Sequence, residues 1–157
     1  MTNLRRATAA DVVQLSLLAA EAYAHYVPRI GREPAPITAD YACLVKAGQV
    51  WVLTEDEQLV GLIVLVPDVD PTLGENVLLV ENVAVRPAAQ GRGLGTRLMA
   101  LAETEAHRLG LRRVSLYTNQ AMTENLGYYS RLGYTETHRS RSDGFDRVFF
   151  SKSLTFE

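Results

Sequence analysis

The spacing of hydrophobic positions changes several times along the chain, and the N-terminal part begins with a helical pattern. Apolar residues recur at helical spacing over residues 12–22, which predicts an amphipathic helix. Thr8, followed three residues later by Asp11, resembles a capping box at the start of this helix, and Pro28 is expected to end it. Prolines, glycines and charges come next, so we expect a turn and then a short second helix from about residue 37 to residue 46.

From residue 49 onward the pattern is typical of strands. The segments "QVWVLT" (49–54) and "LVGLIVLV" (59–66) are separated by the polar turn "EDEQ", which predicts an antiparallel hairpin. A loop is expected over residues 68–75. The next segment, "NVLLVENVAV" (76–85), is rich in branched apolar residues and has the length of a buried central strand. A carboxylate, Glu81, interrupts its apolar run.

The last third of the chain predicts two helices, a strand between them and a terminal hairpin. The first helix spans residues 94–109 and is closed by Gly110. A strand over 113–118, a shorter helix over 122–133 and a hairpin over 135–154 with the turn "SDGF" follow. The apolar stripe of the first helix consists of Leu94, Leu98, Leu101, Ala102 and Leu109. The element order, β-α-α-β-β-β-α-β-α-β-β, is that of a mixed-sheet α/β or α+β domain.

Length and composition fit one globular domain and favour no charged polymer as a partner. The chain has 157 residues, of which 47% are hydrophobic and 22% are charged, so we expect a single domain over residues 1–157. The formal net charge is -2 and the isoelectric point is about 5.9. These values give no global electrostatic reason to bind nucleic acid or an anionic membrane.

Cysteine and histidine usage argues against a metal site. Cys43 is the only cysteine, so neither an internal disulfide nor a cysteine-based metal cluster is expected. His25, His107 and His138 show no ligand spacing, and we expect no metal. The N-terminal segment lacks the apolar stretch of a signal peptide, and the apolar runs are too short to span a bilayer. We therefore expect a cytoplasmic protein.

Three glycines at alternate positions, Gly91, Gly93 and Gly95, stand where the central strand gives way to a helix. A Gly-rich turn at a helix N-terminus presents several backbone N–H groups and the positive end of the helix dipole. Such a turn binds phosphate, and the bare backbone lets the phosphate approach the amides. The alternative is a tight strand-to-helix connection, for which one glycine usually suffices. The segment lacks the lysine of a P-loop and the glycine spacing of a dinucleotide fold.

The residues around these glycines carry a family resemblance. The segment "VENVAVRPAAQGRGLGTRLM" (80–99) resembles the cofactor-binding motif of the GNAT superfamily of acetyl-CoA-dependent N-acetyltransferases, written [QR]-x-x-G-x-[GA], with Gln90, Gly93 and Gly95 at the defined positions. A second segment, "NLGYYSRLGY" (125–134), resembles the later signature of this family. The resemblance covers almost the whole chain. It implies a mixed, mostly antiparallel central sheet of six to seven strands, flanked by about four helices.

The resemblance implies acetyl-CoA as co-substrate. Loop amides from about Gly91 to Thr96 would hold the pyrophosphate, and the strand before them would pair with the pantetheine arm. An amide near Val83 would face the thioester oxygen. The side chains of Arg92 and Arg97 would add positive charge, or they belong to a solvated helix start. The cofactor-binding residues implied in this way are Val83, Ala84, Val85, Gln90, Gly91, Arg92, Gly93, Leu94, Gly95, Thr96, Asn125 and Tyr128.

Two catalytic residues are implied by motif position. Tyr129 would return a proton to the leaving thiolate; alternatively, with Met122 and Leu126, it forms a buried helix face. Glu81 would act as general base through water, in a buried setting that raises its pKa. Its alternative is a charge at the strand end that pairs with an arginine. Asn125, one turn before Tyr129, would reach the cofactor or this tyrosine, or it only frays the helix start.

The acceptor is the least determined part. Tyr26, Arg29 and Arg32 fall in the region that shapes the acceptor pocket in the family, and arginines there would suit a substrate with a carboxylate or phosphate. We expect a primary amine of a small molecule as acceptor. A protein N-terminus or lysine, or a CoA-binding module without turnover, remain alternatives. The segments 118–119 and 144–150 resemble those of a bacterial subgroup, and the apolar strand "DRVFFSKSL" (146–154), taken as a sheet edge, suggests a homodimer.

Overall fold

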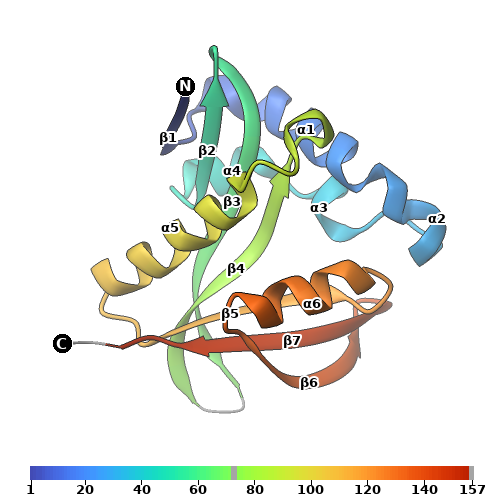
Figure 1. The fold of residues 1–157 in the computed structure, drawn as a ribbon, viewed down its shortest axis with the longest axis vertical. Coiled ribbons are helices and arrows are strands. Elements are labelled where there is room, and N and C mark those ends of the chain that lie inside the picture. The colour runs from blue at the N-terminus through green and yellow to red at the C-terminus, as the bar shows by residue number, and fades with distance from the viewer. Residues whose placement is uncertain (72–73, 156–157) are drawn as a thin grey trace. The chain divides into compact units, whose positions relative to one another are not determined.

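The computed structural model describes residues 1–71 and 74–155 (Figure 1). The chain divides into two compact units. Unit 1 comprises Met1–Leu65 and Asn82–Leu101, and unit 2 comprises Val66–Glu81 and the chain from Ala102 onward. The units are interleaved along the sequence, because the chain leaves unit 1 within one strand and returns to it within the next. Each unit is therefore described separately.

The strands are β1 (Thr2–Arg6), β2 (Val50–Glu55), β3 (Gln58–Asp70), β4 (Glu75–Val85), β5 (Arg113–Asn119), β6 (Thr135–Ser142) and β7 (Phe145–Ser153). They hydrogen-bond in the order β1-β2-β3-β4-β5-β7-β6. The pair β4–β5 is parallel, whereas β1–β2, β2–β3, β5–β7 and β6–β7 are antiparallel. The predicted mixed sheet is confirmed.

The helices are α1 (Val12–Tyr23), α2 (Val27–Ile30), α3 (Ala35–Thr38), α4 (Tyr41–Lys46), α5 (Leu94–Arg108) and α6 (Thr123–Arg131). Short 3-10 turns occur at Ala9–Asp11, Ala24–Tyr26 and Pro87–Ala89. Among the described residues, no helix is long and apolar enough to cross a membrane.

The local signals for α1 and for the β2–β3 hairpin of unit 1 work as predicted. The backbone N–H of Thr8 donates to the carboxylate of Asp11 at 2.8 Å, which is the reciprocal half of a capping box at the turn that leads into α1. Asp56 and Glu57 both have positive φ, 51° and 65°, as a two-residue type I′ hairpin turn requires. The resulting pairing places Val50 opposite Val64. Leu15, Leu18, Ala19, Val50, Val52, Leu53, Leu62 and Ile63 are fully buried.

The prediction for the segment after α1 is wrong in two respects. Pro28 does not end the first helix; α1 ends at Tyr23, and Pro28 lies in the first turn of α2, where its missing N–H costs nothing. The expected single helix over 37–46 is two helices, because Ala39 is extended with ψ 148°. Asp40 then starts α4 by accepting the N–H of Cys43 at 3.0 Å.

Two further boundaries differ from the prediction. The loop expected over 68–75 is shorter, because β3 continues to Asp70; residues 72–73 lie outside the described part. The apolar stripe of α5 does not reach Leu109, which follows the helix and is 43% exposed. The chain turns at Gly110, whose φ is 72°, so the helical spacing no longer applies there.

In unit 2 the sheet has two distinct faces. Leu116 lies opposite Phe150, and Tyr117 lies opposite Phe149, so each pair points to its own side. The helix α6 lies along the Phe150 side, where the rings of Tyr129 and Phe150 are 5.9 Å apart (Figure 1). Leu116 and Phe150 are buried, whereas Tyr117 and Phe149 are half-buried.

The apolar C-terminal strand is not an edge, which corrects the argument for a dimer. β7 lies between β5 and β6, and its apolar side chains Val148 and Phe150 are buried in the sheet. The edge strand is β6, whose side chains are polar and almost all exposed. Charged edge strands oppose edge-to-edge pairing. A homodimer stays a prediction without this support.

Candidate functional site

The predicted phosphate-binding turn lies in unit 1, between the end of β4 and the start of α5. Gly91 and Gly93 have φ values of 80° and 77°, a region that residues with a side chain rarely adopt. A Cβ at either glycine would meet no atom within 4 Å, so conformation rather than crowding requires glycine. Gly95 lies within the first turn of α5. The open space beside these glycines is what an anion needs to reach the backbone.

Helix geometry supplies donors at this turn. The N–H of Arg97 donates to the carbonyl of Gly93 at 3.0 Å, the first bond of the α5 ladder. The amides before it, at Leu94 and Gly95, have no intrahelical acceptor by geometry. Together with the helix dipole they form a positive backbone site. The turn therefore suits a phosphate or pyrophosphate group.

Arg86 and Gln90 hold this turn in place. The backbone N–H of Arg86 donates to the carbonyl of Val60 at 2.8 Å, and its Nε donates to the carbonyl of Leu59 at 3.0 Å. Its Nη1 pairs with Glu21 of α1 at 3.0 Å. The side chain of Gln90 reaches back and donates to the carbonyl of Val85 at 3.1 Å. Sequence reasoning missed this anchoring role of Arg86.

The two arginines of the turn make contacts within the protein. Arg92 forms a two-bond ion pair with Glu55 at the β2–β3 turn, which raises the pKa of Arg92 and lowers that of Glu55. Arg97 donates to the hydroxyl of Thr2 on β1. The charge of Arg92 is thus paired with a carboxylate, whereas Arg97 keeps its charge and bonds to a neutral hydroxyl.

A buried polar network surrounds the last residues of β4 in unit 1. The hydroxyl of Tyr23 lies 2.7 Å from Oδ1 of Asn82 and 2.9 Å from the carbonyl oxygen of Val83, so these two acceptors share its one hydrogen. Nδ2 of Asn82 donates to the hydroxyl of Tyr41 at 2.9 Å, and that hydroxyl donates to the carbonyl of Pro36 at 2.6 Å. The network holds the side chain of Asn82 at both its oxygen and its nitrogen, and it reaches the carbonyl of Val83. Ala84 is buried, and Val83 and Val85 are half-buried.

Sequence reasoning missed Tyr23, Tyr41 and Asn82. The available signal was Asn82, an amide that follows Glu81 within the apolar run of the strand. A buried amide needs partners for both its donor and its acceptor, so its presence predicts a network. The partners themselves lie 41 and 59 residues away in sequence, and no local pattern marks them.

The residues expected to shape the acceptor pocket lie around α2 in unit 1. Tyr26 is buried, and its ring centroid lies 3.9 Å from that of His25. The guanidinium carbon of Arg29 lies 5.0 Å from the centroid of the Tyr26 ring. Arg29 and Arg32 are exposed. The Tyr26 ring is thus buried between its neighbours, and the guanidinium of Arg29 lies over it.

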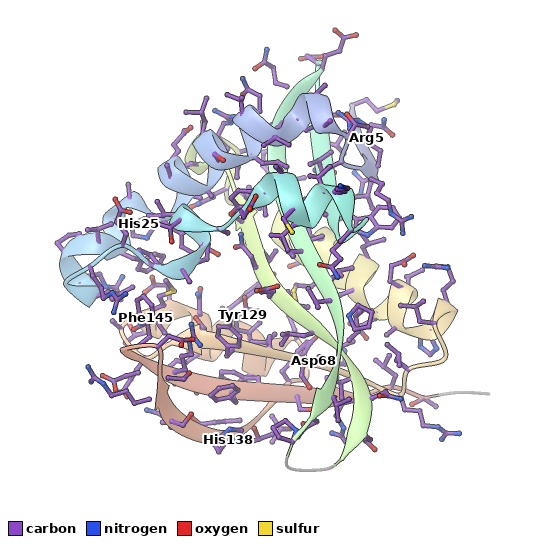
Figure 2. The ribbon with its side chains drawn as sticks, turned by 180° about the vertical axis from the view of Figure 1, so that it is seen from behind. Arg5, His25, Asp68, Tyr129, His138 and Phe145 are labelled. Carbon is purple, nitrogen blue, oxygen red and sulfur yellow. The ribbon has the colours of Figure 1, made fainter. Side chains whose placement is uncertain are left out.

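The predicted acid, Tyr129, lies on α6 of unit 2 and is 6% exposed (Figure 2). Its ring centroid is 5.3 Å from that of Tyr128 and 6.2 Å from that of Tyr134. Asn125 donates from Nδ2 to the hydroxyl of Thr118 at 3.2 Å, which ties α6 to the end of β5. Packing fixes the Tyr129 ring, as a residue that moves a proton requires.

Tyr134 provides a contrast to Tyr129 within the same aromatic cluster. Its hydroxyl is buried and has no hydrogen-bond partner among residues 1–71 and 74–155. Burial raises the pKa of this phenol well above its usual range, and the carboxylate of Glu103 adds to the rise. This hydroxyl has a desolvation cost with no bond to offset it.

Glu81 is exposed, so the expected buried setting is wrong. It directly follows Val80, the β4 residue opposite Leu116 at which the pairing with β5 ends. The pKa of Tyr117 is raised by burial and by the nearby charges of Glu81 and Asp143, and is lowered by Arg147. Strand alternation turns Glu81 away from the buried side of β4, which explains its exposure.

Comparisons with known proteins agree with this geometry. Residues 15–134 match the model of the Acetyltransferase (GNAT) family. N-acetyltransferase 8B of Homo sapiens is 30% identical over 90 residues, 57% of this chain. The match covers 40% of the length of that curated relative.

Solved structures share the fold at low identity. The polyamine N-acetyltransferase of Drosophila melanogaster, which catalyses the formation of N-acetylagmatine, is 19% identical with a TM-score of 0.73, over 98% of this chain and 100% of that chain. Arabidopsis thaliana Naa50, in complex with the bisubstrate analogue CoA-Ac-MVNAL, is 17% identical with a TM-score of 0.72, over 98% and 99%. With the family match over residues 15–134, the chain belongs to the acetyltransferase (GNAT) family of acyltransferases.

Proposed function

We propose that this protein transfers the acetyl group of acetyl-CoA to a primary amine of a small molecule, by direct attack of the amine within a ternary complex. The observation that carries the proposal is the turn at Gly91 and Gly93, where left-handed backbone and open space meet the N-terminus of α5. Family membership supports CoA as co-substrate, and the Arabidopsis relative binds a CoA analogue. Acetyl-CoA supplies the acetyl group as an activated thioester.

The backbone of unit 1 would bind and orient the co-substrate. Amides between Gly91 and Thr96 would hold the pyrophosphate, because they are donors at the positive end of α5. The peptide N–H at Val83 would donate to the thioester oxygen, where negative charge develops during attack. The Tyr23–Asn82 network supports this role, because it holds the side chain of Asn82 and the carbonyl of Val83, on either side of the peptide that carries this N–H.

Side chains of unit 2 would move the protons. A primary ammonium has a pKa of about 10.4, so the amine must lose a proton before it attacks, and Glu81 would accept that proton through water. The leaving thiol has a pKa of about 8.5, and the phenol of Tyr129 would return a proton to the thiolate. Asn125 and Tyr128 would line the cofactor side of α6.

Several finer statements belong to the same proposal. One acyltransferase domain would span residues 1–157, in a cytoplasmic protein of bacterial type that forms a homodimer. The relatives act on acceptors of different kinds, so a protein N-terminus or lysine is the second candidate acceptor. The third candidate function is that of a module that binds CoA without catalysing a transfer. Acceptance of amines by the purified protein separates these three.

A pair of tyrosine variants tests the proposal. Release of free thiol from acetyl-CoA is followed with a panel of small amines and N-terminal peptides, for the wild type, Tyr129→Phe and Tyr134→Phe. We expect Tyr129→Phe to lower kcat about 10²-fold with little change in the Kd for CoA, because it removes a proton donor and keeps the ring. Tyr134→Phe should keep full activity and raise the free energy of unfolding by about 1 kcal/mol, because its hydroxyl is buried without a partner.

Three outcomes contradict the proposal in different ways. If calorimetry detects no binding of CoA, acetyl-CoA is not the co-substrate and the proposed reaction is refuted. Binding of CoA without turnover of any amine favours the module. Equal activity of Tyr129→Phe and the wild type leaves the transfer in place and removes Tyr129 as the acid.

A further inference from the structure

The sheet face of unit 2 opposite α6 carries a row of aromatic rings. Tyr117 lies opposite Phe149, and Phe149 lies opposite His138, so the three point to one side. The ring centroids of Tyr117 and Phe149 are 5.7 Å apart, and His138 stacks on Phe149 at 4.3 Å with an interplanar angle of 7°. His138 and Phe145, labelled in Figure 2, mark the β6–β7 hairpin that carries this face. These residues are exposed or half-buried, except for buried Phe145.

Arg147 brings a positive charge onto this row. It is opposite Asn119, two positions along β7 from Phe149, and so shares the same face. Its guanidinium carbon lies 4.3 Å from the centroid of the Tyr117 ring and 5.5 Å from that of Phe145. The side chain is only 12% exposed. The guanidinium is therefore removed from most of the solvent by two rings.

The charge of Arg147 has an incomplete set of protein partners. Nη1 donates to Ser142 at 3.0 Å and to Asp143 at 3.4 Å, and the side chain of Asp143 is 83% exposed. Within the described part of the chain, Nε and Nη2 have no hydrogen-bond acceptor. Burial of a cation is costly unless an anion and hydrogen bonds compensate it. The two remaining donors match the geometry of a carboxylate.

Glu81 lies on the other side of the same tyrosine. It follows Val80, which lies opposite Leu116 at the end of the β4–β5 pairing, and its charge is close enough to raise the pKa of Tyr117. Arg147 comes from β7 and leans over the Tyr117 ring. Glu81 and Arg147 form no ion pair with each other in the described structure. A negative and a positive group thus flank one aromatic ring without neutralising each other.

We propose that Glu81, Tyr117 and Arg147 form the acceptor subsite of the transferase and select an amine that also carries a carboxylate, as a free amino acid does. This inference rests on the proposed function and names its substrate class. The guanidinium of Arg147, which lies over the Tyr117 ring, binds the carboxylate of the acceptor. The amino group of the acceptor lies next to Glu81. The Tyr117 phenol remains a neutral hydrogen-bond donor, because burial raises its pKa.

The transfer balances with these groups. The ammonium of the acceptor loses one proton to Glu81 through water, and its nitrogen then forms a bond to the acetyl carbonyl carbon while the C–S bond breaks. The nitrogen loses a second proton as the amide forms, and the thiolate takes up one proton to become free CoA. The products are the N-acetylated amino acid, CoA and one proton.

Matched acceptors test the subsite. Free amino acids, their carboxamides and the corresponding decarboxylated amines are compared by kcat/KM at one pH with the wild type, Arg147→Gln, Arg147→Lys and the control Arg141→Gln. Arg141 is on the neighbouring strand β6; its side chain is 69% exposed, and its guanidinium pairs with Asp146 at 3.4 Å. We expect the wild type to prefer the free amino acids by about tenfold or more in kcat/KM.

The variants should separate charge from geometry. In Arg147→Gln the ratio between amino acid and carboxamide should fall to about one, through a rise in KM for the amino acid. Arg147→Lys should keep part of the preference, because it keeps the charge and loses the two-bond geometry. Arg141→Gln should retain the wild-type ratio. Circular dichroism and calorimetry with CoA confirm that each variant is folded and loaded.

The wild type alone decides the inference even if a variant does not fold. A wild type that binds CoA and acetylates carboxamides or plain amines as well as free amino acids overturns the inference and leaves the proposed function intact. A uniform loss of activity in Arg147→Gln across all acceptors also overturns it. Failure to bind CoA at all refutes the proposed function instead.

Discussion

The turn at the start of α5 and the aromatic sheet face of unit 2 recognise their ligands with different parts of the chain. At the turn, the donors are backbone amides, and the arginines beside them are paired with Glu55 and Thr2. On the sheet face, the backbone is already used in strand pairing, and the chemistry lies in Glu81, Tyr117 and Arg147. The turn binds through its backbone conformation, whereas the sheet face binds through side chains that strand pairing brings together.

This difference separates what is common to a family from what is specific to a member. A backbone site depends on where φ is positive and where a helix begins, so it tolerates exchange of most side chains. A side-chain site changes with every substitution on one face of a strand. We therefore expect variants at the turn to alter affinity for CoA, and variants on the sheet face to alter the choice and activation of the amine.

The largest effect is expected from Glu81→Gln on the sheet face. Loss of the general base should lower kcat/KM for the amine about 10²-fold at pH 7, with the Kd for CoA unchanged. The deficit should shrink as the pH rises toward the pKa of the amine, because more of the acceptor is then already deprotonated. Initial rates from pH 6.5 to 9.5 measure this convergence.

Parallel pH profiles for the wild type and Glu81→Gln would contradict the role of Glu81 as base. A fall in CoA affinity would show that Glu81 contributes to binding of CoA, contrary to its assignment to the amine. Glu136→Gln is a suitable control, because Glu136 is an exposed carboxylate on β6 that pairs with Arg139.

A smaller effect is expected from Gly93→Ala at the turn. Alanine in a left-handed conformation costs about 1–2 kcal/mol of stability, and relaxation of the turn should misplace one charge-assisted amide. We expect about tenfold weaker CoA binding in calorimetry and an unchanged order of preference among amines. Gly48→Ala is the matched control, because Gly48 has φ 73° and open space around its Cβ position.

Both glycine variants should lose similar stability, and only Gly93→Ala should lose CoA affinity. Equal CoA affinity in the two variants would show that the turn at Gly93 does not hold the pyrophosphate. A lower thermal midpoint in both, measured without ligand, confirms that the backbone strain is comparable.

The turn could be predicted from the sequence because its signals are local. Glycine at positions 91 and 93 and the apolar period of the following helix lie within one short segment, and the backbone conformation follows from them. The hairpin at Asp56 could be predicted equally well, because polar residues there separate two apolar runs. In such cases, neighbouring residues contain all the information that the structure uses.

The rest of the site depends on which strands become neighbours. Arg147 meets Tyr117 because β7 pairs with β5, and that order is not visible in the composition of either strand. The prediction that β7 is an edge strand was wrong for the same reason, because strand order cannot be read from one strand. Tyr23 and Asn82 meet across 59 residues of sequence. Long-range pairing, rather than propensity, sets these contacts.

The smallest effect is expected from Arg92→Gln, which tests the backbone character of the turn directly. The guanidinium of Arg92 is held by Glu55, and exposed ion pairs of this kind contribute little. We expect the Kd for CoA to change by less than about threefold, with an unchanged dependence on salt concentration between 0.05 and 0.3 M, roughly the range over which screening of exposed charges becomes strong. Isothermal titration calorimetry at both salt concentrations makes the comparison. If the Kd instead rises about tenfold and loses part of its salt dependence, Arg92 leaves Glu55 for the phosphates when CoA binds, and the turn is then a side-chain site as much as a backbone one.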